Sequence, residues 1–87
     1  LNVKALGKLS APKWLNNNWV VGMNDKDNGE FITASSIVAV SVNAKVRQAL
    51  TQNVDMIALY PAASADAKQV AFCTEKGQLY LININIK

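Results

Sequence analysis

The sequence predicts an all-β fold made of antiparallel sheets, and three observations support this class. Short runs of β-branched and aromatic residues are bounded by clusters of Asn, Asp, Gly or Ser, which is typical of strands joined by turns. No apolar run keeps helical spacing over the roughly 10 to 12 residues that favour a helix. The stretch from Pro12 to Gly22 returns as Pro61 to Phe72, and each copy leads through a Gly turn into a β-rich run.

Each expected strand has its own justification. The segment Lys4-Ala5-Leu6 stands before the first copy as Gln48-Ala49-Leu50 stands before the second, which gives a period of 44 residues from Leu6 to Leu50. A period of this length is typical of propellers and solenoids. For 44–52, which contains several good helix formers, a strand is favoured over a short helix. The predicted strands are Asn2 to Leu6, 19–23, 37–42, 44–52, 70–74 and 79–84.

The two copies differ in the connection between their last two strands. The first copy has a long connection, Asp25 to Ser36, where the second has only Glu75 to Gln78. A repeat tolerates an insertion in a loop.

The strands at 37–40 and 70–73 are apolar at nearly every position. Because successive residues of a strand point to opposite faces, both faces of these sheets are expected to be covered. Phe72 is therefore expected in the core. Four-stranded sheets stacked radially form a β-propeller, so the chain is predicted to be a two-blade β-propeller segment with an outer strand at about 1–7, a first blade at about 8–52 and a last blade at about 53–87.

This division places the end of the chain between the third and fourth strands of a blade. The expectation is a piece of a larger propeller, because two repeats rarely suffice for stability. The alternative is self-assembly, in which two-bladed chains close one ring as a homo-oligomer. In either case Asn2 to Leu6 is predicted to pair with Leu79 to Ile86, of a neighbouring copy or through ring closure.

The second copy resembles the TolB-like propeller repeat. The resemblance rests on an Arg47-Gln48-Ala49-Leu50-Thr51 segment, a turn from Pro61 through Ser64, Asp66 and Lys68, an apolar strand ending in Phe72, and Leu79-Tyr80-Leu81-Ile82. The sequence departs from the pattern at Ala67, where the family usually has Gly, and at Ala49, which lengthens the Leu-Thr segment. The first copy has Asn16-Asn17-Asn18 at its turn, and Asn tolerates left-handed backbone.

Composition excludes several function classes. The net charge is +3, but the nine Lys and Arg residues are scattered, so nucleic-acid binding is not expected. No run of about 18 apolar residues that could span a membrane occurs. With no His in the chain, a Ser-His-Asp triad and an imidazole metal ligand are absent, and the chain is not expected to be an enzyme. Cys73, the single cysteine, is expected to be a small buried hydrophobic residue.

One polar cluster and two aromatic residues are candidates for a site. Asp25, Asp27 and Glu30 could offer oxygen ligands to Ca²⁺, but their spacing does not match an EF-hand, and a solvated turn is the favoured interpretation. No catalytic residue, cofactor or other metal ligand is predicted. Trp14 and Trp19 could stack on a sugar, although packing in the core or between blades is favoured.

The resemblance implies a non-catalytic binding scaffold in a periplasmic or extracellular bacterial protein, with a protein partner or the remaining blades held by this segment. The expected ring is six-bladed. Two alternatives stay open. One is the gating propeller of a prolyl-oligopeptidase-like serine peptidase, whose catalytic domain would lie outside this chain. The other is a minor-pilin-like structural subunit, suggested by Trp19-Val20-Val21 before an Asp-rich Gly turn.

Overall fold

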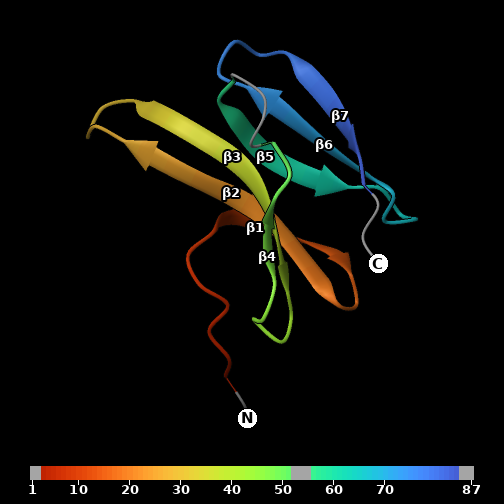
Figure 1. Ribbon diagram of the computed structural model, residues 1–87. Coiled ribbons are helices and arrows are strands. Elements are labelled where there is room, and N and C mark those ends of the chain that lie inside the picture. The colour runs from red at the N-terminus through yellow and green to blue at the C-terminus, as the bar shows by residue number, and fades with distance from the viewer. Residues whose placement is uncertain (1–2, 52–55, 85–87) are drawn as a thin grey trace.

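The protein consists of two antiparallel sheets (Figure 1), seen here in a computed structural model that describes residues 3–51 and 56–84. The first sheet has the strand order β1-β2-β3-β4 and the second has the order β5-β6-β7. No helix occurs in the described ranges. The strands are β1 Ser10–Asn16, β2 Trp19–Asp27, β3 Ile32–Ser41, β4 Arg47–Ala49, β5 Ala58–Ala63, β6 Gln69–Thr74 and β7 Leu79–Asn83.

The two hairpins predicted from the sequence are confirmed. β2 pairs antiparallel with β3, and β6 pairs antiparallel with β7. The expectation of a long connection from Asp25 to Ser36 is wrong, since β2 continues to Asp27 and β3 begins at Ile32. The extra residues of the first copy lengthen a hairpin instead of a loop, and Asp27 pairs with Ile32 at its tip.

The outermost predicted strands are shorter than expected. Of the segment 44–52, only Arg47–Ala49 forms a strand, β4, paired with Val38 to Val40 of β3. Residues 3–9 form no strand within this chain, so the expected outer strand, Asn2 to Leu6, is not formed here. Asn2 and Ile86 lie outside the described residues, and the predicted pairing of these two ends in a larger assembly stays a prediction.

The two sheets share one hydrogen-bonding register, which makes the sequence repeat a structural one. Adding 50 to a residue number in β2 gives its equivalent in β6, and adding 42 in β3 gives its equivalent in β7. Thus the pair formed by Val20 and Val40 corresponds to the pair formed by Val70 and Ile82. Every paired position from 19 to 23 obeys this rule.

The first strands of the two sheets share a β-bulge. Adding 49 to a residue number in β1 gives its equivalent in β5, and both strands show a register shift at the same place, before Pro12 and before Pro61. The residue preceding each proline has positive φ, 48° at Ala11 and 53° at Tyr60. A bulge with one left-handed residue is uncommon outside glycine, so its recurrence supports the equivalence of the two sheets.

The sheets pack face to face (Figure 1), with β5 lying against β1, β2 and β3. The core lies between them and draws side chains from both. Stacked sheets of this kind bury the inner face of each strand. The buried core consists of Leu15, Val21, Met23, Ile37, Ala39, Ala58, Leu59, Val70 and Phe72.

The stacking is head to tail, so equivalent faces of the two sheets do not meet each other. Val21 belongs to the core, but its equivalent, Ala71, lies on the face of the second sheet that points away from it. Conversely, the buried Val70 is equivalent to Val20, on the outer face of the first sheet. Each repeat therefore offers one face to the repeat before it and the other to the repeat after it.

The prediction that strands are covered on both faces is confirmed for one strand and wrong for the other. Every residue from Ile37 to Val40 is buried. In β6, burial alternates: Val70 and Phe72 are buried, whereas Ala71 and Cys73 are half-buried. The difference arises because the second sheet has a neighbour on one face only within the described part of the chain.

Gly22 marks the place where the outer face of the first sheet is covered. A Cβ atom added to Gly22 would lie 2.9 Å from the Cβ of Leu9 and 3.1 Å from the backbone oxygen of Ser10. The equivalent positions in the second sheet are Phe72, for Gly22, and Ala58, for Leu9. In the first sheet the larger residue of the pair, Leu9, precedes β1, whereas in the second sheet the larger residue, Phe72, lies on β6. Packed interiors tolerate such compensating changes in size.

Two turns share one hydrogen-bonding pattern, which the sequence comparison did not reveal. In the β5–β6 turn, the Ser64 hydroxyl donates to Asp66 Oδ1 at 2.7 Å, the Lys68 N–H donates to the same oxygen at 3.0 Å, and the Gln69 N–H donates to Ser64 Oγ at 3.1 Å. The residue between Asp66 and Lys68, Ala67, has φ +61°. This is the position at which the TolB-like pattern has Gly, the residue best suited to left-handed backbone.

The β3–β4 turn repeats these contacts in the sequence Ser41-Val42-Asn43-Ala44-Lys45-Val46. The Ser41 hydroxyl donates to Asn43 Oδ1 at 2.6 Å, and the Lys45 N–H donates to the same oxygen at 2.9 Å. Ala44 has φ +62°. An Asx side chain that closes its own turn is a common local solution, and here Asn and Asp perform it equally.

Candidate functional site

The acidic residues singled out in the sequence lie along the end of the β2–β3 hairpin. Asp25 is half-buried on β2, and Asp27 and Glu30 are exposed. Asp27 Oδ1 accepts a hydrogen bond from the Gly29 N–H at 3.0 Å, and Asn28 Oδ1 accepts from the Glu30 N–H at 2.9 Å. Among the residues described, no three carboxylate or thiol side chains gather in a way that could hold a metal ion. Asp27 thus acts on its own turn.

One concave feature of the described residues is a groove of about 650 Å³. It lies at the end of the strands where the β2–β3 hairpin and the β6–β7 turn are found. Within the described residues β4 pairs only with 38–40 of β3, and the preceding part of β3 contributes residues 33–36 to the groove. Its lining residues are Asn24, Lys26, Thr33, Ala34, Ser35, Ser36, Thr51, Met56, Ile57, Glu75 and Lys76.

The groove is polar and carries charge of both signs. Lys26 comes from β2, whereas Glu75 and Lys76 come from the β6–β7 turn. Amines, a carboxylate and hydroxyl groups can donate and accept hydrogen bonds to a polar segment. The arrangement is suited to recognition.

Sequence reasoning missed this groove. It depends on Glu75 and Lys76 lying near a hairpin some 50 residues earlier in the chain, and no local motif carries that information. One signal was present: the short connection Glu75 to Gln78 follows the strand equivalent to β2, so the repeat alone places both turns at the same end of the two sheets.

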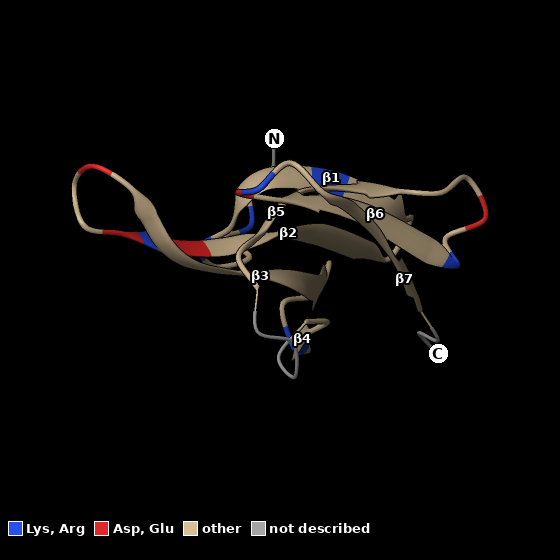
Figure 2. Ribbon diagram, turned by 90° about the horizontal axis from the view of Figure 1, so that it is seen from above, with Lys and Arg blue, Asp and Glu red and all other residues tan. Residues whose placement is uncertain are grey.

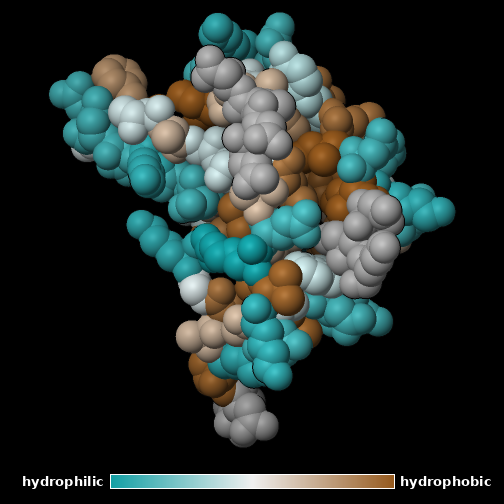
Figure 3. Space-filling view, viewed as in Figure 1, coloured by the Kyte–Doolittle hydropathy of each residue, from teal (hydrophilic) through white to brown (hydrophobic). Residues whose placement is uncertain are grey.

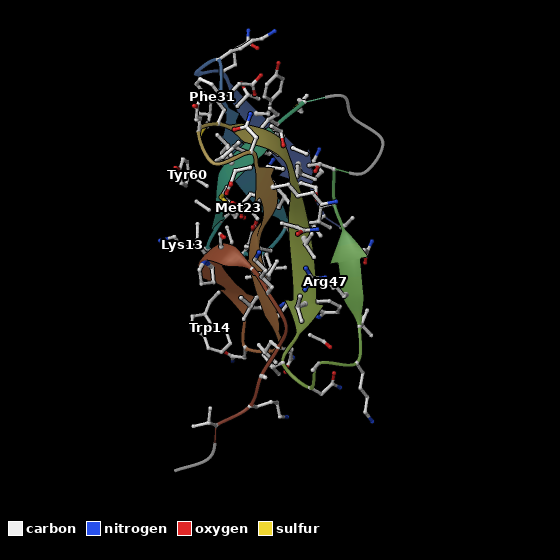
Figure 4. All side chains as sticks on the ribbon, turned by 90° about the vertical axis from the view of Figure 1, so that its left-hand side faces the viewer. Lys13, Trp14, Met23, Phe31, Arg47 and Tyr60 are labelled. Atoms are coloured by element: carbon white, nitrogen blue, oxygen red, sulfur yellow. The ribbon has the colours of Figure 1, made fainter. Side chains whose placement is uncertain are left out.

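Two exposed aromatic residues lie on the same side of the molecule (Figure 4). Trp14 of β1 is 68% exposed and Tyr60 of β5 is 61% exposed. Trp14 therefore does not pack in the core of this chain, because it lies on an edge strand whose buried residue is Leu15. The other expectation, packing between blades, stays a prediction. Trp19 packs against the core, as expected.

Among the described residues, Lys and Arg do not form a continuous stripe, and Figure 2 shows them at separate places on the strands and turns. Arg47 has a structural contact, since its guanidinium donates to the backbone oxygen of Lys8 at 3.1 Å. Cys73 is a free thiol, half-buried, with its Sγ 3.7 Å from the backbone oxygen of Leu59.

In the described ranges, no helix is long and apolar enough to cross a membrane. Comparison with family models, with curated proteins and with solved structures gave no match. The internal repeat and the groove at one end of its strands are therefore the two features from which a function can be inferred.

Proposed function

We propose that the chain is a segment of a TolB-like β-propeller and serves as a non-catalytic binding scaffold. The observation that carries this proposal is the head-to-tail stacking of two sheets with one shared register and one shared bulge. A repeat that offers different faces to its two neighbours is suited to build a ring of such units. The resemblance of the Pro61 to Lys68 turn to the TolB-like pattern supports the same architecture, and through it a periplasmic or extracellular location.

The groove supports a partner held at one end of the sheets. Scaffolds position binding residues on loops, because loops can vary without disturbing the strands. Glu75 and Lys76 lie on such a turn, and Lys26 lies near the end of β2. The charges of these three residues suit a polar peptide segment of a protein partner. The absence of His from the sequence supports binding over acid–base catalysis.

The open reading frame that encodes the chain tests the architecture. Further copies of the repeat beside the chain would support a propeller. An adjoining hydrolase domain with a Gly-x-Ser-x-Gly motif would replace the scaffold with a gating propeller of a peptidase. An apolar helix upstream, in place of more repeats, would replace it with a pilin-like subunit.

The binding role is tested by selecting peptides from a phage-displayed library on the immobilised protein. We expect selected peptides to lose binding to a Lys26→Ala, Lys76→Ala double variant and to keep binding to a matched Lys13→Ala, Lys45→Ala variant, which removes the same charge outside the groove. Both variants should unfold at the temperature of the parent protein. Peptides that ignore the groove variant, or a selection that yields none, would contradict the proposal.

A further inference from the structure

The four outer strands of the two sheets differ in how well their open edges are protected. β1 and β5 each contain a bulge and a proline, which has no N–H to donate. β4 is three residues long. β7, by contrast, is a regular strand of five residues with β6 on one side only in the described part of the chain. β7 is therefore the edge best able to accept another strand.

The first sheet shows what the β7 edge would accept. β3, the equivalent of β7, pairs on that side with β4. Gln48-Ala49-Leu50, which includes the end of β4, is matched in the sequence by Lys4-Ala5-Leu6. Residues 3–6 form no strand within the chain, and Val3 is 97% exposed. The chain thus contains a copy of the fourth strand that is not paired in its own sheets.

The face beside this edge is also incomplete. Leu79 and Leu81 are 74% and 64% exposed, whereas their equivalents in the first sheet, Ile37 and Ala39, are fully buried. Figure 3 shows hydrophobic surface over the region where the strands of the second sheet lie in Figure 1. In the first sheet this face is covered by β5, which follows β4 in the chain and packs against β3.

We propose that a second copy of this chain adds its residues 3–6 to β7 as an antiparallel fourth strand. The contacts of β4 with β3 set the register. Val38 pairs with Ala49, Ala39 with Gln48 and Val40 with Arg47. Transferred by the repeat, these pairs place Tyr80 opposite Ala5, Leu81 opposite Lys4 and Ile82 opposite Val3 of the second copy.

The same addition covers the exposed leucines. In the second copy β1 follows residues 3–9, as β5 follows β4 within one chain, and β1 is the equivalent of β5. The second copy's β1 then packs over Leu79 and Leu81, as β5 packs over β3. The contact continues an interface that the chain already makes, and it requires neither a closed ring nor the peptide groove.

Cross-linking between two differently labelled copies tests the register. In a Cys73→Ser background, one copy carries Lys4→Cys and the other carries Leu81→Cys, so that neither chain can form an internal disulfide. Residues directly opposite on antiparallel strands come within disulfide reach after small adjustments. Under mild oxidation we expect a disulfide-linked dimer from this mixture. The matched control mixes Lys4→Cys with Tyr80→Cys, one residue out of register and on the opposite face, and should give roughly tenfold less dimer.

A second measurement does not depend on the cysteines. Lys4→Pro removes an N–H that the transferred register directs at β7. The Leu50 N–H donates to the Ile37 oxygen, so the next N–H of that strand that faces β3 is that of Gln48, the equivalent of Lys4. Lys4 lies outside every strand of the chain, so the fold of the monomer is preserved. We expect this variant to sediment as a monomer at protein concentrations where the parent chain associates. Equal cross-linking in both mixtures, or a parent chain that stays monomeric at high concentration, would overturn the proposal and leave the peptide-binding role untouched.

Discussion

Ala67→Gly should stabilise the protein, because Ala67 occupies a backbone conformation that suits glycine. Its φ is +61°, in the left-handed region that costs a residue with a Cβ about 1–2 kcal/mol. Glycine removes that cost but loses more backbone entropy on folding, about 0.5–1 kcal/mol. The expected net gain is therefore about 0.5–1 kcal/mol.

Thermal unfolding followed by circular dichroism can resolve this gain. For a domain of this size, 1 kcal/mol moves the midpoint by about 4–8 °C, so we expect an increase of roughly 2–8 °C. Ala44→Gly should raise the midpoint in the same way, since Ala44 has a φ of +62° in the matching β3–β4 turn. Ala65→Gly is the control: Ala65 lies in the same turn without a positive φ, so glycine there should lower the midpoint. If Ala67→Gly and Ala44→Gly both lower it as well, the reasoning about these turns is refuted.

Three further substitutions have defined outcomes. Phe72 is 4% exposed and stacks on Tyr80 with ring centroids 5.7 Å apart. Phe72→Ala should therefore lower the free energy of unfolding by about 3–5 kcal/mol; an unchanged denaturant midpoint would place Phe72 on the surface. Gly22→Ala should cost about 1–3 kcal/mol by overpacking against Leu9. Adding Leu9→Gly, which removes the Cβ atom 2.9 Å from the added methyl group, should recover part of this loss, whereas purely additive effects would exclude the clash. The Asp66→Asn variant should keep the turn at pH 7. It should lose less stability than the parent protein when the pH falls below 3.8, the ordinary pKa of the carboxyl group, and melting curves at pH 7 and pH 3 can show this difference.

The sign of the pH effect follows from the contacts of Asp66. The hydrogen bond from the Ser64 hydroxyl, and after it the one from the Lys68 N–H, lowers the pKa of Asp66 below its ordinary value of 3.8. A carboxyl whose pKa falls on folding stabilises the protein above the unfolded pKa, and this stability is lost as the pH falls through the folded pKa. Asn43 performs the same role without a charge in the β3–β4 turn, so Asn at position 66 should preserve the geometry.

The sequence was sufficient for the hairpins and for the repeat. Trp19 to Met23 and Val70 to Thr74 have the β-branched and aromatic residues of buried strands, and Gly77 lies in the turn of the second hairpin, with φ +80°. The long first hairpin was missed because Asp25 to Ser36 is rich in Asp, Asn, Gly and Ser, which are poor strand formers. In the structure, cross-strand pairing with β2 holds this polar stretch extended.

Other features depend on contacts that are distant in the sequence. The exposure of Trp14 follows from its place on an edge strand, and an edge cannot be distinguished from a central strand by composition. The groove is lined by residues of β2, β3 and the β6–β7 turn, which lie far apart in the sequence. Of the candidate residues in the hairpin, Asp27 accepts a hydrogen bond from the Gly29 N–H. This contact within the turn agrees with the turn-forming interpretation that the sequence favoured.

Gly22 with Leu9, and Phe72 with Ala58, each combine a small side chain with a large one, but on opposite strands. This difference limits how copies of the repeat can be exchanged or added. If a gene duplication, or a protein engineer, moved the second β-hairpin into the place of the first, Phe72 would arrive where Leu9 fills the space beside Gly22. Moving the strand that carries Ala58 along with it would restore the fit. The two residues of such a pair must therefore be transferred together. A longer array of these repeats would be extended by whole sheets and not by single hairpins.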